Sequence, residues 1–468
     1  MDKLDLAFTS AIDQAKLIRD RTVSPLELVE LYLERIQRLD PQIGSYFTVM
    51  ADQALAEAKA KTEKLGRNSQ DLPPFFGVPI SIKDLNPVAG VPCSYGIRAL
   101  MAQPAEWEPA LVGLIRAAGF TILGKTATSE LGSMPFTEPA GFPPTRNPWS
   151  LEYTAGGSSG GAAAAVAAGL CAIAQGSDGG GSVRGPASCC GVVGLKPSRG
   201  RISNAPVGDR ISGIATDGSI ARTVADAAAL LDIMSGYITG DPYWLPPPEI
   251  SFLEATKSPP KPLRIAFATN LPLVGQAAPS CKQAVLETAQ VLAEMGHTLE
   301  EGCPDFSDLV EPFTVVWQTA IAAAGVPVEL LQPINQWFFS RVVDAGTYLR
   351  AVSQMQIISR RIVSFFDNYD ALLIPVYMHA PIRVGEWAQL SPPEVLQKTI
   401  DWIAPCPPFN ATGQPAIALP VGLDEGGLPT AVQLVGKPAA ESTILALAAE
   451  LERAKPGSQR PPLSVESN

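Results

Sequence analysis

Histidine is almost absent from this sequence, which has two, His297 and His379, in a chain of 468 residues. A histidine base or a set of histidine metal ligands is therefore hard to assemble. His297 stands at the end of an amphipathic helical pattern (EMGHTLEE), and His379 follows an apolar, strand-like run (VYMHAP). This scarcity disfavours both a Ser-His-Asp hydrolase and a zinc enzyme, and we expect no metal.

Cysteine occurs seven times, an odd number, and no pair has the C-x-x-C spacing of redox or metal motifs. Cys189 and Cys190 are adjacent and cannot easily form a disulfide. We therefore expect reduced thiols and a cytoplasmic location. The N-terminal stretch (MDKLDLAFTSAIDQAKLIRD) carries acidic residues and lacks the basic and apolar regions of a secretory signal.

Long apolar runs and basic clusters are also missing. The most apolar stretch, residues 161–174, is mostly alanine and shorter than the ~20 residues of a membrane span. The net charge is −11, and acidic and basic residues are interspersed. Such a balance opposes binding to nucleic acid or to an anionic membrane, so we expect neither as a partner.

Glycine and serine, by contrast, are concentrated in residues 156–197, with GGSSGG at 156–161 and GGGS at 179–182. Glycine lets the backbone approach a ligand closely, successive N–H groups can form an anion site, and a neighbouring hydroxyl can attack there. Neither cluster matches a phosphate loop or a dinucleotide fingerprint. A phosphate-loop match at residues 119–126 (GFTILGKT) has bulky middle residues, and we interpret it as chance.

Serine hydrolysis suits these clusters better. Residues 156–160 spell G-x-S-x-G, but the preceding residues 149–155 make a poor strand for a nucleophile elbow, and both histidines are badly placed. A lysine base is available instead. Residues 77–84 (GVPISIKD) alternate apolar and polar side chains and predict a strand that ends at Lys83. From this pattern alone, we would interpret Lys83 as a solvated lysine at a strand end.

Three landmarks together resemble the amidase signature family. They are the lysine strand at 77–84, the GGSSGG loop, and the segment DGGGSVRGPA at 178–187. The likeness continues through residues 194–197, 221–226 and 413–416, so it covers most of the chain. The resemblance implies one large α/β domain over residues 1–468, built on a mixed, twisted β-sheet covered on both faces by helices. It implies no cofactor.

The resemblance also implies a role for individual residues. Ser182 would be the nucleophile, Ser158 the proton bridge that follows a cis peptide bond, and Lys83 the base. The remaining assignments are oxyanion donors at Gly179, Gly180 and Gly181, supports at Ser159, Asp178 and Arg184, and an acyl-pocket border at Leu131 and Gly132.

The chain is expected to fall into four parts. These are an N-terminal helical part (1–66), a core with the catalytic residues (67–237), a proline-rich connector (238–262), and a part that completes the sheet and the substrate pocket (263–468). Within the core, residues 217–236 show helical spacing. The aromatic residues of 306–366, among them Trp317, Trp337, Phe338 and Phe339, could line a substrate funnel or belong to the core.

The function that the resemblance implies is hydrolysis of a small linear or cyclic amide, through a serine acyl-enzyme, to a carboxylic acid and ammonia or an amine. A homodimer is compatible with the N-terminal helices. One alternative is the A subunit of a tRNA-dependent amidotransferase, which residues 198–212 weaken because they lack the stretches typical of such subunits. The other is a non-catalytic binding protein on the same scaffold, which the intact Lys83, Ser158 and Ser182 oppose.

Overall fold

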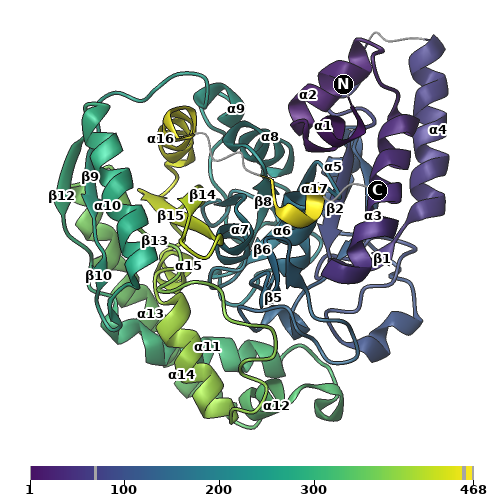
Figure 1. Cartoon of the computed structure of the whole chain (residues 1–468). Helices are drawn as coiled ribbons and strands as arrows, with labels where there is room; N and C mark the ends of the chain where they lie inside the picture. The colour runs from purple at the N-terminus through teal and green to yellow at the C-terminus, as the bar shows by residue number, and fades with distance from the viewer. Residues whose placement is uncertain (1, 68–70, 456–459, 466–468) are drawn as a thin grey trace.

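A computed structural model describes residues 2–67, 71–455 and 460–465. Its centre is an eleven-stranded β-sheet that runs through the molecule (Figure 1). In order across the sheet, the strands are β1 (Tyr46–Val49), β3 (Thr121–Thr126), β2 (Pro79–Lys83), β6 (Ile173–Asp178), β8 (Thr216–Ala221), β7 (Val193–Lys196), β14 (Ala416–Leu423), β15 (Pro429–Gly436), β13 (Ala371–Pro375), β9 (Arg264–Phe267) and β12 (Thr298–Glu301). Two small ladders stand apart from it, β4 (Arg146–Asn147) with β5 (Ser150–Thr154) and β10 (Asn270–Leu271) with β11 (Gly275–Gln276).

The sheet is mixed in direction. Strands β3, β2 and β6 run parallel to one another. From β6 through β8, β7, β14 and β15 to β13, every pairing is antiparallel. Strands β13, β9 and β12 are again parallel. This sheet and the helices that flank it confirm the expected single α/β domain.

Helices cover the sheet, and Figure 1 shows the N-terminal ones gathered at one end and α10 and α13 at the other. They are α1 (Lys3–Phe8), α2 (Ala11–Arg19), α3 (Pro25–Ile43), α4 (Ala51–Arg67), α5 (Ala110–Ala117), α6 (Gly160–Ala167), α7 (Arg184–Cys190), α8 (Val224–Met234), α9 (Phe252–Ala255), α10 (Pro279–Glu294), α11 (Val310–Ala322), α12 (Pro333–Phe339), α13 (Ala345–Ser364), α14 (Pro392–Ile403), α15 (Pro407–Ala411), α16 (Glu441–Ala454) and α17 (Pro462–Val465). Short 3₁₀ turns are η1 (Arg98–Ala102), η2 (Glu130–Gly132), η3 (Ser307–Leu309), η4 (Val328–Leu330) and η5 (Phe365–Asp367).

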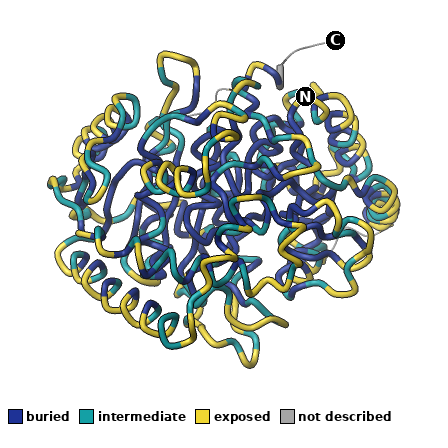
Figure 2. The backbone as a smooth tube through the Cα atoms, turned by 90° about the horizontal axis from the view of Figure 1, so that it is seen from below, coloured by how far each residue is buried: buried dark blue, intermediate teal, exposed yellow. Residues whose placement is uncertain are grey.

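The alanine-rich helix α6 lies in the middle of the molecule, where Figure 2 shows the backbone to be buried, and all its residues are buried. Small side chains are needed there because the backbone is close on several sides: a Cβ on Gly161 would lie 2.3 Å from the Ala127 nitrogen. The run is thus a core helix. Within the described residues, no helix is both long and apolar enough to cross a membrane.

The structure differs from two local predictions. The helix predicted over residues 217–236 is wrong in its first part, because Thr216–Ala221 is strand β8 and helix α8 begins only at Val224. Residues 149–155, which we expected to be a poor strand, contain strand β5. Strand β8 is buried along its whole length between two other strands, so it lacks the alternation that marks a half-exposed strand.

Candidate active site

The predicted base and the predicted bridge meet in the structure. Lys83 ends strand β2, and its Nζ lies 2.7 Å from Ser158 Oγ, although the two residues are 75 positions apart. Nζ also donates to Ser177 Oγ at 3.0 Å. Ser158 follows a cis peptide bond from Gly157, as the resemblance implied. The Lys83 side chain is therefore part of a buried polar contact rather than a solvated lysine at a strand end.

The environment of Lys83 favours its neutral form. The side chain is fully buried, and burial lowers the pKa of Lys83 from 10.5 to about 7. The negative charges of Asp178 and Asp217 act in the opposite direction, and the positive charge of Arg210 adds to the lowering. Burial is the largest of these effects. A lysine with this pKa can accept a proton near neutral pH.

Asp84, the next residue in sequence, is paired elsewhere. Its carboxylate lies 2.7 Å from Lys125 Nζ, both side chains being fully buried, and it also accepts from the Ser94 backbone N–H. Lys125 lies in strand β3, which contains most of the phosphate-loop match at residues 119–126. Because this lysine is held in a buried ion pair inside the sheet, the structure agrees that the match is accidental.

Ser182 lies in the turn between strand β6 and helix α7 and is 8% exposed. The Ser159 N–H donates to the Ser182 carbonyl at 3.2 Å, which joins the GGSSGG loop to the turn that carries Ser182. Ser159 Oγ donates to the Ser177 carbonyl at 3.2 Å, in line with a supporting role. In the described part of the chain, the Ser182 hydroxyl makes no hydrogen bond, so it is not held away from a substrate.

The three glycines before Ser182 differ in whether their N–H groups already have a hydrogen-bond partner. The Gly181 N–H donates to Asp178 Oδ1 at 2.8 Å. Among the described residues, the N–H groups of Gly179, Gly180 and Ser182 have no such partner. These three free N–H groups are therefore better placed to bind an oxyanion than that of Gly181, which instead fixes the turn.

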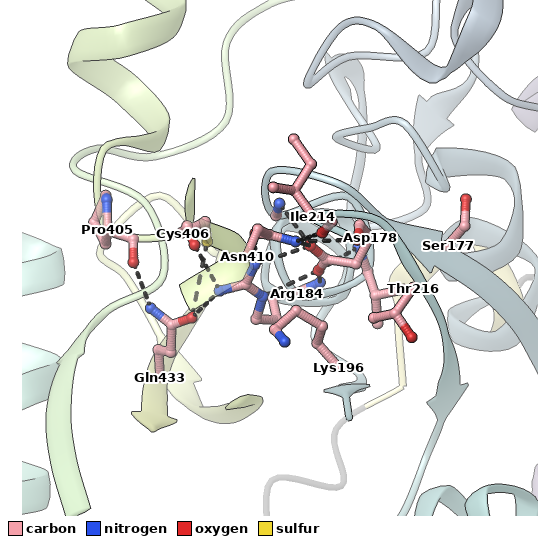
Figure 3. A network of polar contacts seen from close by, with 12 residues as sticks. Ser177, Asp178, Arg184, Lys196, Ile214, Thr216, Pro405, Cys406, Asn410 and Gln433 are labelled. Carbon is pink, nitrogen blue, oxygen red and sulfur yellow. Dashed lines mark hydrogen bonds and ion pairs between the residues drawn. The ribbon is translucent and has the colours of Figure 1, made fainter. Parts of the chain in front are cut away.

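Asp178 and Arg184 form the anchor of this turn, as Figure 3 shows. Arg184 Nη2 lies 2.9 Å from Asp178 Oδ1, and its Nε donates to Oδ2 at 3.0 Å, both side chains being fully buried. Burial alone would raise the pKa of Asp178, but the charge and hydrogen bonds of Arg184 hold it well below its usual range. The same pairing raises the pKa of Arg184 against the effect of burial. Both groups stay charged.

The partners of this pair come from the C-terminal part of the chain. Arg184 donates to Asn410 Oδ1 and to Gln433 Oε1, each at 2.6 Å, and Asn410 Nδ2 donates in turn to Asp178 Oδ1 at 2.9 Å. Sequence reasoning gave neither residue a role. Asn410 lies just before residues 413–416, whose family likeness was the available signal.

Gly132 lies beside Ser158, and Leu131 precedes it in the same 3₁₀ turn. Both have left-handed backbones, with φ of 52° and 69°. A Cβ on Gly132 would lie 3.3 Å from Ser158 Oγ, so this position must stay small. The preceding residue, Glu130, is buried and accepts from Asn335 Nδ2 at 2.7 Å, which ties the segment to helix α12.

A cavity of about 100 Å³ opens next to this segment and to Gly180, in the turn that carries Ser182. Its walls include Gly180 and the side chains of Phe313, Trp317 and Phe338. Trp317 also packs on Gly179, where a Cβ would lie 3.1 Å from its ring. Of the aromatic residues that could line a substrate funnel or belong to the core, Trp317 and Phe338 line the cavity. Phe339 does neither, since it is 37% exposed.

Neither histidine is part of this site. His297 lies 3.3 Å from Glu450 and accepts from the Leu263 N–H, and His379 stacks on Trp402. Across the described ranges, no group of three or more histidine, cysteine or acidic side chains could hold a metal ion. The functional groups gathered here are two serines, a lysine and backbone amides.

Comparison with known proteins decides the family. A family model described as Amidase matches residues 27–445. The chain belongs to the amidase family. This amidase is 55% identical over 457 residues to a Synechocystis sp. protein named "Putative amidase", which covers 97% of this chain and 90% of that protein.

A second relative has a more specific name. The 6-aminohexanoate-cyclic-dimer hydrolase of Paenarthrobacter ureafaciens is 34% identical to the amidase over 493 residues, covering 99% of this chain and 98% of that one. A solved structure of 6-aminohexanoate cyclic dimer hydrolase complexed with substrate superposes with a TM-score of 0.92 at 31% identity, covering 98% of this chain and 99% of that one. The protein is an enzyme that hydrolyses amide C–N bonds.

Proposed function

We propose that the amidase works through a triad of Ser182, Ser158 and Lys83. The observation that carries this proposal is the 2.7 Å contact between the buried Lys83 Nζ and Ser158 Oγ, at a lysine whose pKa is about 7. When Lys83 is neutral, it accepts the Ser158 hydroxyl proton. Ser158 can then take the proton of Ser182 as Ser182 Oγ attacks the carbonyl carbon.

The attack gives a tetrahedral intermediate whose oxygen carries the negative charge. The N–H groups of Gly179, Gly180 and Ser182 would bind this oxyanion, and a single donor of this kind lowers the barrier by about 3–4 kcal/mol. Collapse breaks the C–N bond, and the leaving nitrogen takes the proton back from Ser158. The acyl group stays on Ser182 as an ester. Water then attacks this ester and gives its proton to the same relay. The bond to Ser182 breaks, the relay returns the proton to Ser182 Oγ, and the acid is released.

The substrate is a small amide, linear or cyclic, whose acyl part enters the apolar cavity. This cavity argues against the amidotransferase alternative, because glutamine brings a charged carboxylate and ammonium group. Among the described residues that line it, none carries a charge to pair with them. We also place the reaction in a reducing compartment such as the cytoplasm, since seven cysteines are free, most of them buried.

Two experiments test the triad. A small fluorophosphonate should add once to the wild type and not to Ser182→Ala, as measured by intact mass. Lys83→Met should lower kcat/KM for a neutral amide by about 10⁴-fold at neutral pH, because the general base is lost. Lys257→Met, at an exposed lysine, serves as the control. Full turnover by Lys83→Met would contradict the mechanism.

A further inference from the structure

Two hydroxyl groups in the cavity have no hydrogen-bond partner. Thr399, on helix α14, and Ser133, beside the pocket border, both line the cavity and are 7% and 5% exposed. Within the described part of the molecule, neither side-chain oxygen is paired. A buried hydroxyl without a partner costs about 1–3 kcal/mol, so natural proteins rarely keep one without a use for it.

The case of Thr399 is clearer because other helical threonines avoid this cost. Thr314 also lines the cavity, and its hydroxyl donates to the Val310 carbonyl one turn back at 2.7 Å. Thr288 and Thr319 do the same at 2.7 Å. This local bond is the ordinary solution for a helical threonine. Thr399 does not make it, and its hydroxyl remains available to a ligand.

The surroundings limit what that ligand can be. The described residues that line the cavity are uncharged, and most of them are aliphatic or aromatic. An ion brought into such a site would lose its hydration without compensation. A hydroxyl both donates and accepts, so it matches an amide, which offers a carbonyl and an N–H. The cavity therefore suits a hydrocarbon chain that carries a neutral polar group.

We infer that the amidase selects uncharged substrates whose acyl part carries a second neutral hydrogen-bonding group, such as a second amide, which is bound by Thr399 and Ser133. This inference rests on the proposed function, because it takes the cavity beside Gly180 as the acyl site. The two hydroxyls would add a preference for particular acyl groups, which the triad alone does not provide. A simple aliphatic amide lacks the group that would pair with these hydroxyls, and an amide acid brings a charge in its place.

The test compares three compounds at each of several chain lengths: an aliphatic diamide, the matching monoamide and the matching amide acid. Ammonia release gives kcat/KM for each compound, counted per amide group. We expect the wild type to prefer the diamide over the monoamide by about tenfold, as one or two buried hydrogen bonds would give, and to use the amide acid least. Thr399→Val should reduce the preference about fivefold, and Ser133→Ala should reduce it in the same direction.

Thr314→Val is the matched control, since its hydroxyl is already bonded within its helix and the diamide preference should stay as in the wild type. An unchanged preference in Thr399→Val, or a preferred amide acid, would overturn the inference. The melting temperature of unliganded Thr399→Val should equal or exceed that of the wild type, because an unpaired hydroxyl is removed. A clear drop would mean that the hydroxyl already has a partner and would also overturn it. Turnover that persists in Ser182→Ala would refute the triad instead, so the two failures are distinguishable.

Discussion

The pH dependence of catalysis should report the pKa of Lys83. A pKa lowered from 10.5 to about 7 means that the folded environment as a whole disfavours the charged form by about 5 kcal/mol. At neutral pH, about half of the molecules then carry a neutral lysine, against about 0.03% for a lysine with an ordinary pKa. We expect kcat/KM for an uncharged amide to rise about tenfold per pH unit in the acid range and to level off above about pH 7.

A charge change near Lys83 should move this profile in a known direction. Arg210 lowers the pKa of Lys83, and its Nη1 lies 3.1 Å from Asp217, whose charge raises that pKa. Arg210→Gln removes the first effect and leaves the second unopposed. The midpoint of the kcat/KM profile should therefore move to higher pH by about half a unit.

Arg264→Gln, at an exposed arginine paired with Glu300, is the control and should leave the midpoint in place. Stopped assays of ammonia release between pH 5 and pH 9, with the same uncharged amide, measure all three proteins. A profile that is flat below pH 7, or a midpoint that Arg210→Gln leaves unmoved or shifts to lower pH, would refute Lys83 as the titrating base.

The same burial has a consequence for stability. Because the pKa of Lys83 is lower in the folded protein than in the unfolded chain, the unfolded chain still binds the proton between about pH 7 and pH 10.5. The penalty from this lysine is therefore complete below about pH 7 and disappears as the pH rises toward 10.5. Lys83→Met should remove part of this penalty and unfold at higher denaturant concentration than the wild type at pH 6, while losing activity. If Lys83→Met were less stable than the wild type, burial of the Lys83 charge would not carry the free-energy cost inferred here.

Two further predictions concern stability, and chemical denaturation at neutral pH measures both. Arg184→Met leaves the buried carboxylate of Asp178 unpaired and should cost about 3–5 kcal/mol of unfolding free energy, so a loss under about 1 kcal/mol would contradict the anchor. Gly185→Ala would place a Cβ 1.7 Å from the Tyr377 hydroxyl and should lower the free energy of unfolding by at least about 1–3 kcal/mol. Gly113→Ala, in a helix where no atom lies within 4 Å of the new Cβ, should raise it by about 0.5–1 kcal/mol. Equal effects of the two alanines would show that the close approach is not real.

The contact between Lys83 and Ser158 could be anticipated from the sequence because each residue lies in a compact motif whose family likeness carries the geometry. The end of strand β2 and the GGSSGG loop are local features. Strand β2 pairs with β6, and Ser159 of the loop donates to the Ser177 carbonyl in β6, so both features meet at the end of β6. The sequence also indicated Leu131 and Gly132 as neighbours of the site, which agrees with the closeness of Gly132 to Ser158.

The anchor of Arg184 could not be anticipated in the same way. Its partners Asn410, in the short helix α15, and Gln433, in strand β15, lie 226 and 249 residues further along the chain, and single polar residues of this kind carry no periodic signal. Whether the Thr399 hydroxyl bonds within its helix depends on the rotamer of the side chain, which cannot be predicted from the sequence. Strand β8 was misread because its residues (TDGSIA) are all buried and include polar ones, so the stretch shows neither the alternation of a half-exposed strand nor a continuous apolar run.

The position of Asn410 and Gln433 has a consequence for the timing of activity during synthesis. A nascent chain that has emerged only as far as strand β8 contains Lys83, Ser158 and Ser182, yet it lacks Asn410 and Gln433, two of the side chains that accept hydrogen bonds from Arg184. Long-range contacts of this kind form late, because their ends must first be synthesised and brought together. Partly made or prematurely terminated chains should thus carry Lys83, Ser158 and Ser182 without all the contacts that hold the turn of Ser182, and we expect such chains to be inactive.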